Sequence, residues 1–441
     1  MNVYDSSRMA DVVAPLGYES SETAADADLV ILNTCHIREK ATEKLFSELG
    51  RLRTLQKAKA EKGERMIVAV AGCVAQAEGA EIQRRAPYVD MVFGPQTYPQ
   101  LPEMIARVTR GAGGILNTDF PVEPKFDALP QQEKTGISAF LSIQEGCDKF
   151  CAFCVVPYTR GAEYSRSIKA ICEEAHLLIE KGAREITLLG QNVNAFHGMA
   201  EDGSVWGLGK LIHALAKIPN LKRLRYTTSH PSDMDAALID AHRDVPSLMP
   251  FLHLPVQSGA DPVLAAMNRK HKAADYLDLV GKLRAARPDL ALSSDFIVGF
   301  PGETEADFAQ TLDFVRTVGF AQAYSFKYSR RPGTPAAALP NQIPEEVKDA
   351  RLHALQEILR DQQIKFNQSL VGKTLPVLFD DDGRHEGQIH GRSPFTQSTY
   401  IPLPPRGRDA IVGQELQVII TSARQNSLKG DLAIPLGGVR E

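Results

Sequence analysis

Three cysteines lie close together in the stretch EGCDKFCAFCVVPYTRG, residues 145–161. Cys147, Cys151 and Cys154 are separated by four and three positions, which gives the pattern C-x3-C-x2-C. Thiolates are the ligands that soft metals prefer, and three on one short loop can wrap a single compact centre. A cube of four irons needs four ligands, so three cysteines leave one iron open to another molecule. The spacing therefore predicts a [4Fe-4S] cluster with one exchangeable position.

The motif is also compatible with a structural zinc site or with a chance grouping of core cysteines. A zinc site would need a fourth Cys or His, and the nearest are Cys172 and His176, both within a predicted helix. Cys172 shares an apolar stripe of that helix with Ile168 and Ile171, so we expect it in the core. The number and spacing of the ligands favour the iron–sulfur cluster over both alternatives.

The elements around the motif are those of an α/β protein. Six strand candidates run through the central region, and a helix pattern follows each except the last: 137–144, 185–191, 222–229, 250–256, 292–299 and 322–329. Six βα units predict a partial barrel, because a complete one has eight. The motif directly follows the first strand, so we expect it at the carboxyl ends of the strands, where barrel enzymes place their active sites.

The N-terminal region shows a second α/β pattern. Helices and strands alternate, with helices at 5–16, 37–60 and 75–86 and strands at 27–33, 65–72 and 88–94. Near-continuous apolar strands joined by helices predict a parallel sheet covered on both faces, hence a small doubly wound domain. The Pro-rich stretch 121–136 that follows is predicted to be a linker.

Two further cysteines come directly after two of these N-terminal strands. Cys35 follows the first strand and Cys73 follows the second. In a doubly wound sheet, ligands bind beyond the carboxyl ends of the strands, so the two thiols can converge there. Two ordinary buried cysteines would give the same pattern, because cysteine is among the most buried residue types. The pattern alone leaves both interpretations open.

The C-terminal region changes character. A Pro-rich stretch at 330–344 precedes a predicted helix at 345–368, and the strands TLPVLFDDDG and ELQVIITSA in residues 369–434 predict a small all-β barrel. The whole chain has a net charge of −4, from 50 basic and 54 acidic residues, which argues mildly against a polyanion-binding protein. The sequence has neither a membrane-length apolar run nor a signal-peptide pattern, so a cytoplasmic protein is expected.

The cysteine motif, with Phe153 just before its last cysteine, resembles the radical S-adenosylmethionine superfamily. Further stretches are similar to the methylthiotransferases, essentially from end to end: ILNTCHIREKA, VAGCVAQ, VVPYTRGAEYSR, LLGQNVNAF, TTSHP, HLPVQSGAD, MNRKH and DFIVGFPGET. HLPVQSG and MNRKH point to the branch that modifies isopentenylated adenosine in tRNA. The branch that modifies a ribosomal protein is the near competitor.

The resemblance implies three domains: a methylthiotransferase N-terminal domain at 1–110, a radical S-adenosylmethionine core at 133–365 and a TRAM-like RNA-binding barrel at 366–434. Cys147, Cys151 and Cys154 would hold the catalytic cluster, and the open iron would bind S-adenosylmethionine, which one-electron reduction cleaves to a radical. Phe153, Gly190, Gln191 and Gly299 would help to bind this cofactor. Cys35 and Cys73 would belong to a second, auxiliary [4Fe-4S] cluster that takes part in sulfur delivery.

The implied reaction is methylthiolation of carbon 2 of an isopentenylated adenosine beside the tRNA anticodon. The implied partners are a tRNA anticodon stem-loop, a flavodoxin- or ferredoxin-like electron donor and a sulfur donor, with the enzyme itself a monomer. In the barrel, Phe395 and Tyr400 are candidates for stacking on bases. A non-catalytic iron–sulfur or zinc RNA-binding protein is an alternative from another functional class.

Three further residues can also be explained without any contact to a ligand. Gly299 belongs to a Gly-Phe-Pro-Gly stretch that could be a tight turn with no ligand. Arg160 and Arg166 flank the cysteine loop, where each could neutralise a carboxylate or phosphate or simply lie in solvent.

The opening MNVYDSSRMADVVAPLGYES predicts a helix with no strand before it. In the family that this chain resembles, a strand precedes this helix, and the third cysteine of the auxiliary cluster lies at the end of that strand. We therefore expect Met1 to be an internal methionine, and we expect this chain to hold the auxiliary cluster poorly, on Cys35 and Cys73 alone.

Overall fold

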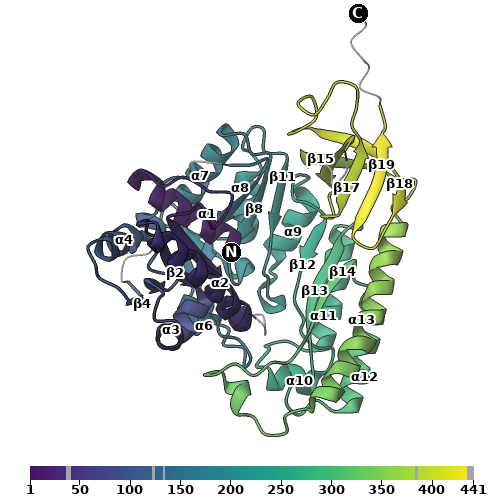
Figure 1. Ribbon diagram of the computed structural model, residues 1–441. Coiled ribbons are helices and arrows are strands. Elements are labelled where there is room, and N and C mark those ends of the chain that lie inside the picture. The colour runs from purple at the N-terminus through teal and green to yellow at the C-terminus, as the bar shows by residue number, and fades with distance from the viewer. Residues whose placement is uncertain (36–40, 122–124, 133–134, 383–385, 435–441) are drawn as a thin grey trace, which may run out of the picture. The chain divides into compact units, whose positions relative to one another are not determined.

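The computed structural model describes residues 1–35, 41–121, 125–132, 135–382 and 386–434 (Figure 1). The chain divides into two compact units. Unit 1 comprises residues 1–133, 145–148 and 154–164, and unit 2 comprises residues 134–144, 149–153 and 165–441. The start of the predicted helix at 37–60 lies outside the described residues, as does part of the predicted linker.

Unit 1 contains a four-stranded parallel sheet of order β1-β2-β3-β4. Its strands are β1 Leu29–Thr34, β2 Ile67–Gly72, β3 Met91–Phe93 and β4 Ile115–Asn117. Its main helices are α1 Asn2–Val13, α2 Ala41–Glu61, α3 Cys73–Arg85 and α4 Leu101–Thr109. The predicted N-terminal parallel sheet is confirmed, and the sequence pattern missed β4 and α4.

Alternate residues of β2 enter two separate cores, which explains its continuous apolar sequence. Ile67 and Ala69 pack in one core with α1 and α4, whereas Val68 and Val70 pack in another with α2 and α3. The predicted linker is more ordered than expected: its described part includes helix α5, Lys125–Ala128. Lys125 is buried, so this stretch is anchored to unit 1 rather than being a simple tether.

Unit 2 contains all six predicted strands, in two three-stranded parallel sheets. The first sheet has the order β11-β8-β5 and the second β12-β13-β14, with strands β5 Ser138–Ser142, β8 Glu185–Leu189, β11 Arg223–Tyr226, β12 Phe251–His253, β13 Ala291–Val298 and β14 Gln322–Lys327. One apolar core joins these strands to helices α7 Ile168–Glu180, α8 Leu208–Leu215, α9 Ala236–Asp244, α11 Ala273–Ala286 and α12 Glu305–Val318.

Helix α12 shows how local sequence sets the ends of these helices. Thr304 and Asp307 form a capping box, in which each side chain accepts a hydrogen bond from the other residue's backbone N–H. Gly319 ends the helix in the left-handed region, with φ of +66°.

Helix α13, Glu345–Gln368, leads into a closed five-stranded barrel of order β15-β16-β17-β19-β18 (Figure 1). The strands are β15 Thr374–Asp382, β16 Gln388–Arg392, β17 Ser398–Pro402, β18 Glu415–Ala423 and β19 Ser427–Leu432. The predicted small C-terminal barrel is therefore confirmed. The helix bounds match the prediction, whereas β16, β17 and β19 were missed because their polar, turn-rich sequences carry little pattern.

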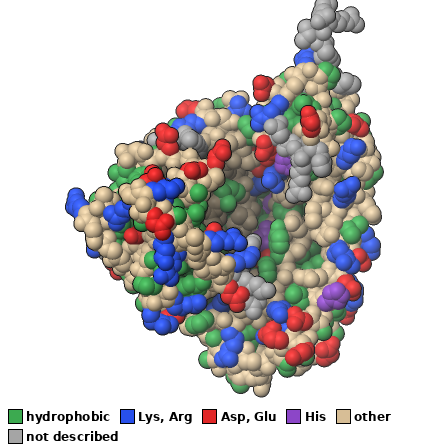
Figure 2. Space-filling view, viewed as in Figure 1, with side chains coloured by type: hydrophobic (Ala, Val, Ile, Leu, Met, Phe, Trp, Pro, Cys, Tyr) green, Lys and Arg blue, Asp and Glu red, His purple; other side chains and the backbone are tan. Residues whose placement is uncertain are grey.

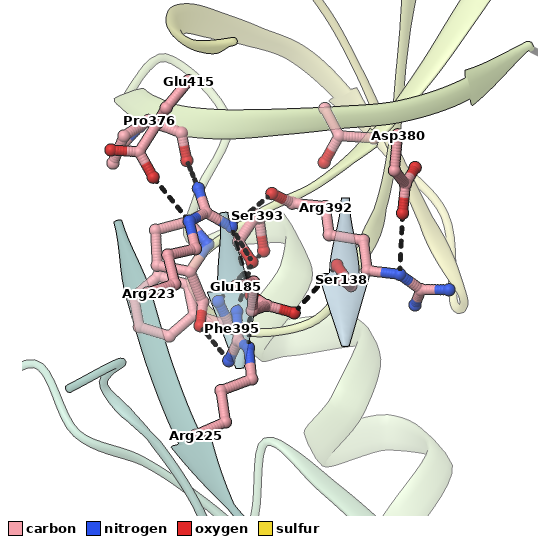
Figure 3. Close-up of polar contacts among 12 residues, drawn as sticks. Ser138, Glu185, Arg223, Arg225, Pro376, Asp380, Arg392, Ser393, Phe395 and Glu415 are labelled. Carbon is pink, nitrogen blue, oxygen red and sulfur yellow. Dashed lines mark hydrogen bonds and ion pairs between the residues drawn. The ribbon is translucent and has the colours of Figure 1, made fainter. Parts of the chain in front are cut away.

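Two buried arginines of β11 hold the C-terminal barrel against the strands of the core (Figure 3). Arg223 donates to the backbone carbonyls of Pro376 and Arg392, at 2.7 and 2.8 Å, and its Nε lies 2.5 Å from Glu415. Arg225 donates to the carbonyls of Ser393 and Pro394. Glu185 of β8 supports Arg225 at 2.8 Å. This arginine clamp, Arg223 and Arg225 with Glu185, fixes the barrel through its main chain.

We expect Arg223→Met to loosen the barrel, because the substitution leaves Glu415 and several carbonyls without their donor. Removing one partner of a buried ion pair costs about 3–5 kcal/mol. Hydrogen exchange should accelerate at the amides of β15 and of residues 392–398, with the helices of the core unchanged. Arg243→Met is the matched control, since Arg243 forms only exposed pairs on α9 with Asp240 and Asp244. Equal exchange in both variants would contradict the clamp.

Candidate metal centre

The middle of the cysteine loop, residues 149–153, is fastened to unit 2 by its backbone. Ala152 donates to the carbonyl of Met267 at 2.9 Å and accepts from the N–H of Ala336 at 2.9 Å. The Asn268 side chain donates to the carbonyl of Phe150 at 2.8 Å. Phe150 has φ of +48°, so the chain turns sharply here. These contacts give Cys151 a fixed backbone.

Arg269 is the cation that contacts Cys151. Its Nη1 lies 3.6 Å from the Cys151 Sγ, and its Nη2 donates to the carbonyl of Pro255 at 2.6 Å. Both residues are buried. This contact holds the Cys151 side chain against a guanidinium that is itself fixed by a backbone carbonyl. Sequence reasoning gave Arg269 no role of its own, although it lies in the stretch MNRKH that carries part of the family resemblance.

Two histidines near Arg269 are held neutral. Burial, together with Arg269 and His271, lowers the pKa of His230 to about 2. Burial, with Arg269, also lowers the pKa of His271 to about 4. Lys149, in the loop itself, forms an ion pair with Asp233 at 2.6 Å. At neutral pH the positive charge beside Cys151 therefore comes from Arg269 and not from imidazole.

The two ends of the cysteine loop belong to unit 1 and meet in a buried cluster of four charges. The charge cluster consists of Asp5, Lys125, Glu145 and Arg160. Arg160 lies 2.5 Å from Asp5 and 2.7 Å from Glu145, and Lys125 lies 2.7 Å from Glu145. Burial alone would raise the pKa of Asp5, but Arg160 and Lys125 outweigh it and hold this pKa below its usual value. Arg160 is thus not in solvent, one of the two options that the sequence left open.

Cys35 and Cys73 follow adjacent positions of the unit 1 sheet. Thr34 and Gly72 pair in the β1–β2 register, and each cysteine is the next residue in its chain. Gly72 has φ of +91°, and a Cβ there would lie 2.6 Å from the carbonyl oxygen of Thr34, so only glycine fits this approach. Cys73 is buried and Cys35 partly buried. The two cysteines therefore lie just beyond the carboxyl ends of two neighbouring strands, at the same end of the sheet.

Cys73 also acts electrostatically on Arg160. Burial lowers the pKa of Arg160, but Asp5, Cys73 and Glu145 outweigh that effect and raise this pKa well above its usual value. Within unit 1, Arg160 therefore interacts both with Cys73, at the end of the sheet, and with Glu145, at the end of the cysteine loop.

Cys172 and Arg166 both lie within unit 2. Cys172 packs against the unit 2 core, as expected, and burial raises the pKa of its thiol. Arg166 donates to the carbonyl of Ser142 and pairs with Glu174 at 2.6 Å, so it too lies out of solvent. Among the described residues, no three His, Cys, Asp or Glu side chains are arranged to hold a metal ion. The metal-ligand assignments of Cys35, Cys73, Cys147, Cys151 and Cys154 therefore stay predictions.

The four residues predicted to bind the cofactor have neighbours within the protein. A Cβ at Gly190 would lie 2.4 Å from the Gln144 side-chain oxygen, which accepts from the N–H of Gln191 at 2.9 Å. Gly299 has φ of +70°, donates to Glu303 at 2.6 Å and leaves no room for a Cβ beside Lys348. Phe153 packs in a small apolar cluster with Phe300. Close packing within the chain thus accounts for both glycines, and their role toward a cofactor stays a prediction.

Three family models match the chain: the Radical SAM superfamily over residues 141–315, the Uncharacterized protein family UPF0004 over residues 1–94 and the TRAM domain over residues 368–433. The chain is 60% identical over 437 residues to the tRNA-2-methylthio-N(6)-dimethylallyladenosine synthase of Maricaulis maris (strain MCS10), across 98% of this chain and 95% of that protein. The chain belongs to this synthase family. The resemblance seen in the sequence is confirmed.

Solved structures share the fold at low identity. The radical S-adenosylmethionine methyltransferase TsrM from Kitasatospora setae, with cobalamin and a [4Fe-4S] cluster bound, has a TM-score of 0.56 and 15% identity, over 76% of this chain and 74% of that one. The same enzyme with tryptophan and a cofactor analogue has a TM-score of 0.57 and 14% identity, over 76% and 72%. No helix in the described parts of the chain is both long and apolar enough to cross a membrane.

Membership of the radical S-adenosylmethionine superfamily implies a [4Fe-4S] cluster and S-adenosylmethionine. The donor chemistry of the cysteine loop suits this cluster. Cys147, Cys151 and Cys154 supply three soft sulfur donors within one loop.

We expect Arg160→Met to destabilise unit 1 strongly, because it leaves Asp5 and Glu145 buried with only Lys125 as a counterion. Denaturant unfolding of the metal-free chain under anaerobic conditions should show a loss of about 3–5 kcal/mol. The double variant Asp5→Asn/Arg160→Met should recover part of this loss, since one uncompensated carboxylate is gone. Arg84→Met, which removes an exposed pair with Glu81 on α3, is the control. A single variant as stable as this control would contradict the role of the charge cluster.

Proposed function

We propose that this chain methylthiolates carbon 2 of N(6)-isopentenyladenosine next to the tRNA anticodon, by radical S-adenosylmethionine chemistry. The observation that carries the proposal is the 60% identity, over 98% of the chain, to a tRNA-2-methylthio-N(6)-dimethylallyladenosine synthase. The matches to the Radical SAM and TRAM family models also support it.

In this proposal, Cys147, Cys151 and Cys154 hold the catalytic cluster, and Phe153, Gly190, Gln191 and Gly299 line the cofactor site. When bound, the cluster supplies the electron with which S-adenosylmethionine chemistry begins. The chain fixes the loop that carries the ligands. Met267, Asn268 and Ala336 hold its backbone, and Arg269 contacts the Cys151 sulfur. These contacts position the cysteines and take no part in bond breaking.

The six strands of unit 2 would form a partial barrel within the segment 133–365, which we propose as the radical domain. Segment 1–110 would be a doubly wound methylthiotransferase domain and segment 366–434 the RNA-binding barrel. Cys35 and Cys73 would be two of the ligands of a second [4Fe-4S] cluster, beyond the carboxyl ends of β1 and β2. The pairing of Thr34 with Gly72 on neighbouring strands supports this assignment.

The proposed partners are a tRNA anticodon stem-loop, a flavodoxin- or ferredoxin-like electron donor and a sulfur donor. We propose a cytoplasmic monomer. Acidic and basic side chains are mixed on the face of the barrel seen in Figure 2, and Asp380 lies 3.5 Å from Arg392. RNA recognition there would depend more on shape and base contacts than on charge alone.

A methylthiotransferase that acts on a ribosomal protein is the alternative from the same superfamily, and a non-catalytic RNA-binding protein is the alternative from another class. The identity to the synthase favours the tRNA substrate over both.

The chain, purified and reconstituted anaerobically, should convert an anticodon stem-loop containing N(6)-isopentenyladenosine into its 2-methylthio derivative and release 5′-deoxyadenosine. Mass spectrometry of nucleosides measures both. Cys151→Ser should abolish both products, whereas Cys172→Ser, at a core position, should retain them. Release of 5′-deoxyadenosine without RNA product, combined with modification of a ribosomal protein, would overturn the tRNA assignment. Zinc without labile sulfide would favour the binding protein.

Cys73→Ser should separate the two proposed clusters. The variant should lose iron and sulfide relative to the unsubstituted chain and make no methylthiolated RNA, while it still cleaves S-adenosylmethionine. Cys172→Ser again serves as the control. Iron content equal to that of the control would show that Cys73 is an ordinary buried cysteine.

A further inference from the structure

A cavity of about 430 Å³ lies within unit 2, where the C-terminal barrel meets the strands of the core. The core side consists of residues from β12 and from the N-terminal parts of β13 and β14, among them His253, Ser293 and Tyr324, together with Thr227 just after β11. The barrel side consists of the segment between β16 and β17, residues 395–398, with Arg392 before it. The end of α13 and the turn between β18 and β19 complete the wall. Its size is in the range of small-ligand sites.

The lining has an unusual chemical composition. Six carboxamide side chains contribute to it: Gln322, Gln363, Asn367, Gln397, Gln425 and Asn426. Aromatic rings come from the core strands, from α13 and from the barrel. Among the described residues that line the cavity, none is Asp, Glu or Lys, and the only permanently charged one is Arg392. Amides both donate and accept hydrogen bonds, so such a wall matches the edge of a neutral heterocycle.

Tyr324 offers an aromatic surface that is already held in place. Its hydroxyl accepts a hydrogen bond from Gln322 Nε2 at 2.8 Å, and its ring packs nearly perpendicular to that of His253, at a centroid distance of 6.2 Å. His253 is in turn 3.1 Å from the Ser293 hydroxyl. The Tyr324 side chain is nevertheless 48% exposed. A large, oriented and exposed ring is the usual platform on which a nucleobase stacks.

The opposite wall is rigid as well. Asn367 donates to the carbonyls of Arg424 and Gln425 and accepts from Gln397 at 3.0 Å, which ties α13 to both barrel segments. The arginine clamp holds the carbonyls of Arg392 and Ser393 just before residues 395–398 (Figure 3). Both walls are thus fixed before any ligand arrives, which reduces the entropy cost of binding.

We propose that this joint cavity, between the barrel and β12–β14, accepts one unstacked nucleobase of the RNA substrate, different from the adenosine that is modified. Tyr324 stacks on the base, the amides of Gln363 and Gln397 face its edge, and the half-exposed Arg392 guanidinium meets the adjoining phosphate. The inference rests on the proposed function, because it takes RNA as the substrate. It assigns the recognition of loop sequence to a preformed pocket rather than to a basic surface.

The test measures binding of the full chain to an anticodon stem-loop with N(6)-isopentenyladenosine, by fluorescence anisotropy. Tyr324→Ala should weaken binding about tenfold or more, as expected for loss of one stacked base. Tyr324→Phe keeps the ring and should stay within about threefold of the unsubstituted chain. Gln363→Ala should weaken binding as well. Gln356→Ala, on an exposed turn of the same helix, is the matched control and should have no effect.

A series of stem-loops, each lacking the base at one loop position, identifies the occupant. One abasic RNA should bind the unsubstituted chain and Tyr324→Ala equally well, and its abasic position should not be the modified adenosine. The inference would be overturned if the two proteins had equal affinity only for the RNA that lacks the modified adenosine. It would also be overturned if Tyr324→Ala and Gln363→Ala bound every RNA as tightly as the unsubstituted chain does. Both of these results leave the proposed function intact.

Two further results distinguish other failures. If the unsubstituted chain does not bind the isopentenylated stem-loop at all, the proposed function falls together with this inference. If free nucleoside monophosphates bind with micromolar affinity and Tyr324→Ala abolishes that binding without any effect on RNA, the cavity is a metabolite site and the inference is wrong.

Discussion

The ends of the cysteine loop depend on four buried charges. Asp5, Lys125, Glu145 and Arg160 come from distant parts of the sequence and neutralise one another within unit 1. Glu145 precedes Cys147 by two residues and Arg160 follows Cys154 by six, so the pairs fasten the chain on both sides of the motif. Because an unpaired buried charge costs several kcal/mol, none of the four can move independently. The helix that contains Asp5 and the short helix that contains Lys125 thereby become part of the support for the loop.

The middle of the loop has a different kind of anchor. Backbone hydrogen bonds to Met267 and Ala336 fix its main chain, and Arg269 meets the Cys151 sulfur. A loop whose backbone is already held loses little conformational entropy when it binds a ligand. Charge pairs at the two ends and backbone contacts in the middle achieve this by independent means. Substitutions in one set should therefore leave the other in place.

Sequence reasoning recovered the elements whose signal is local. The six strands of the core, the sheet of unit 1, helix α13 and the C-terminal barrel all follow from apolar periodicity and turn residues. It also placed Cys172 in the core correctly. What it missed depends on contacts between distant residues. Lys125 lies in a polar, Pro-rich stretch that gives no sign of burial, and the roles of Arg223, Arg269 and Gln144 appear only once their partners are known. The short strand β4 has too few residues to show a period.

The arginine clamp has a consequence for how the C-terminal barrel can change. Arg223 and Arg225 bind the barrel almost entirely through the carbonyl oxygens of Pro376, Arg392, Ser393 and Pro394, an attachment that every amino acid can provide. Side chains in these segments can therefore be exchanged while the barrel keeps its seat on the core strands. Natural variation can alter the surface of the barrel without first having to rebuild the joint that holds it.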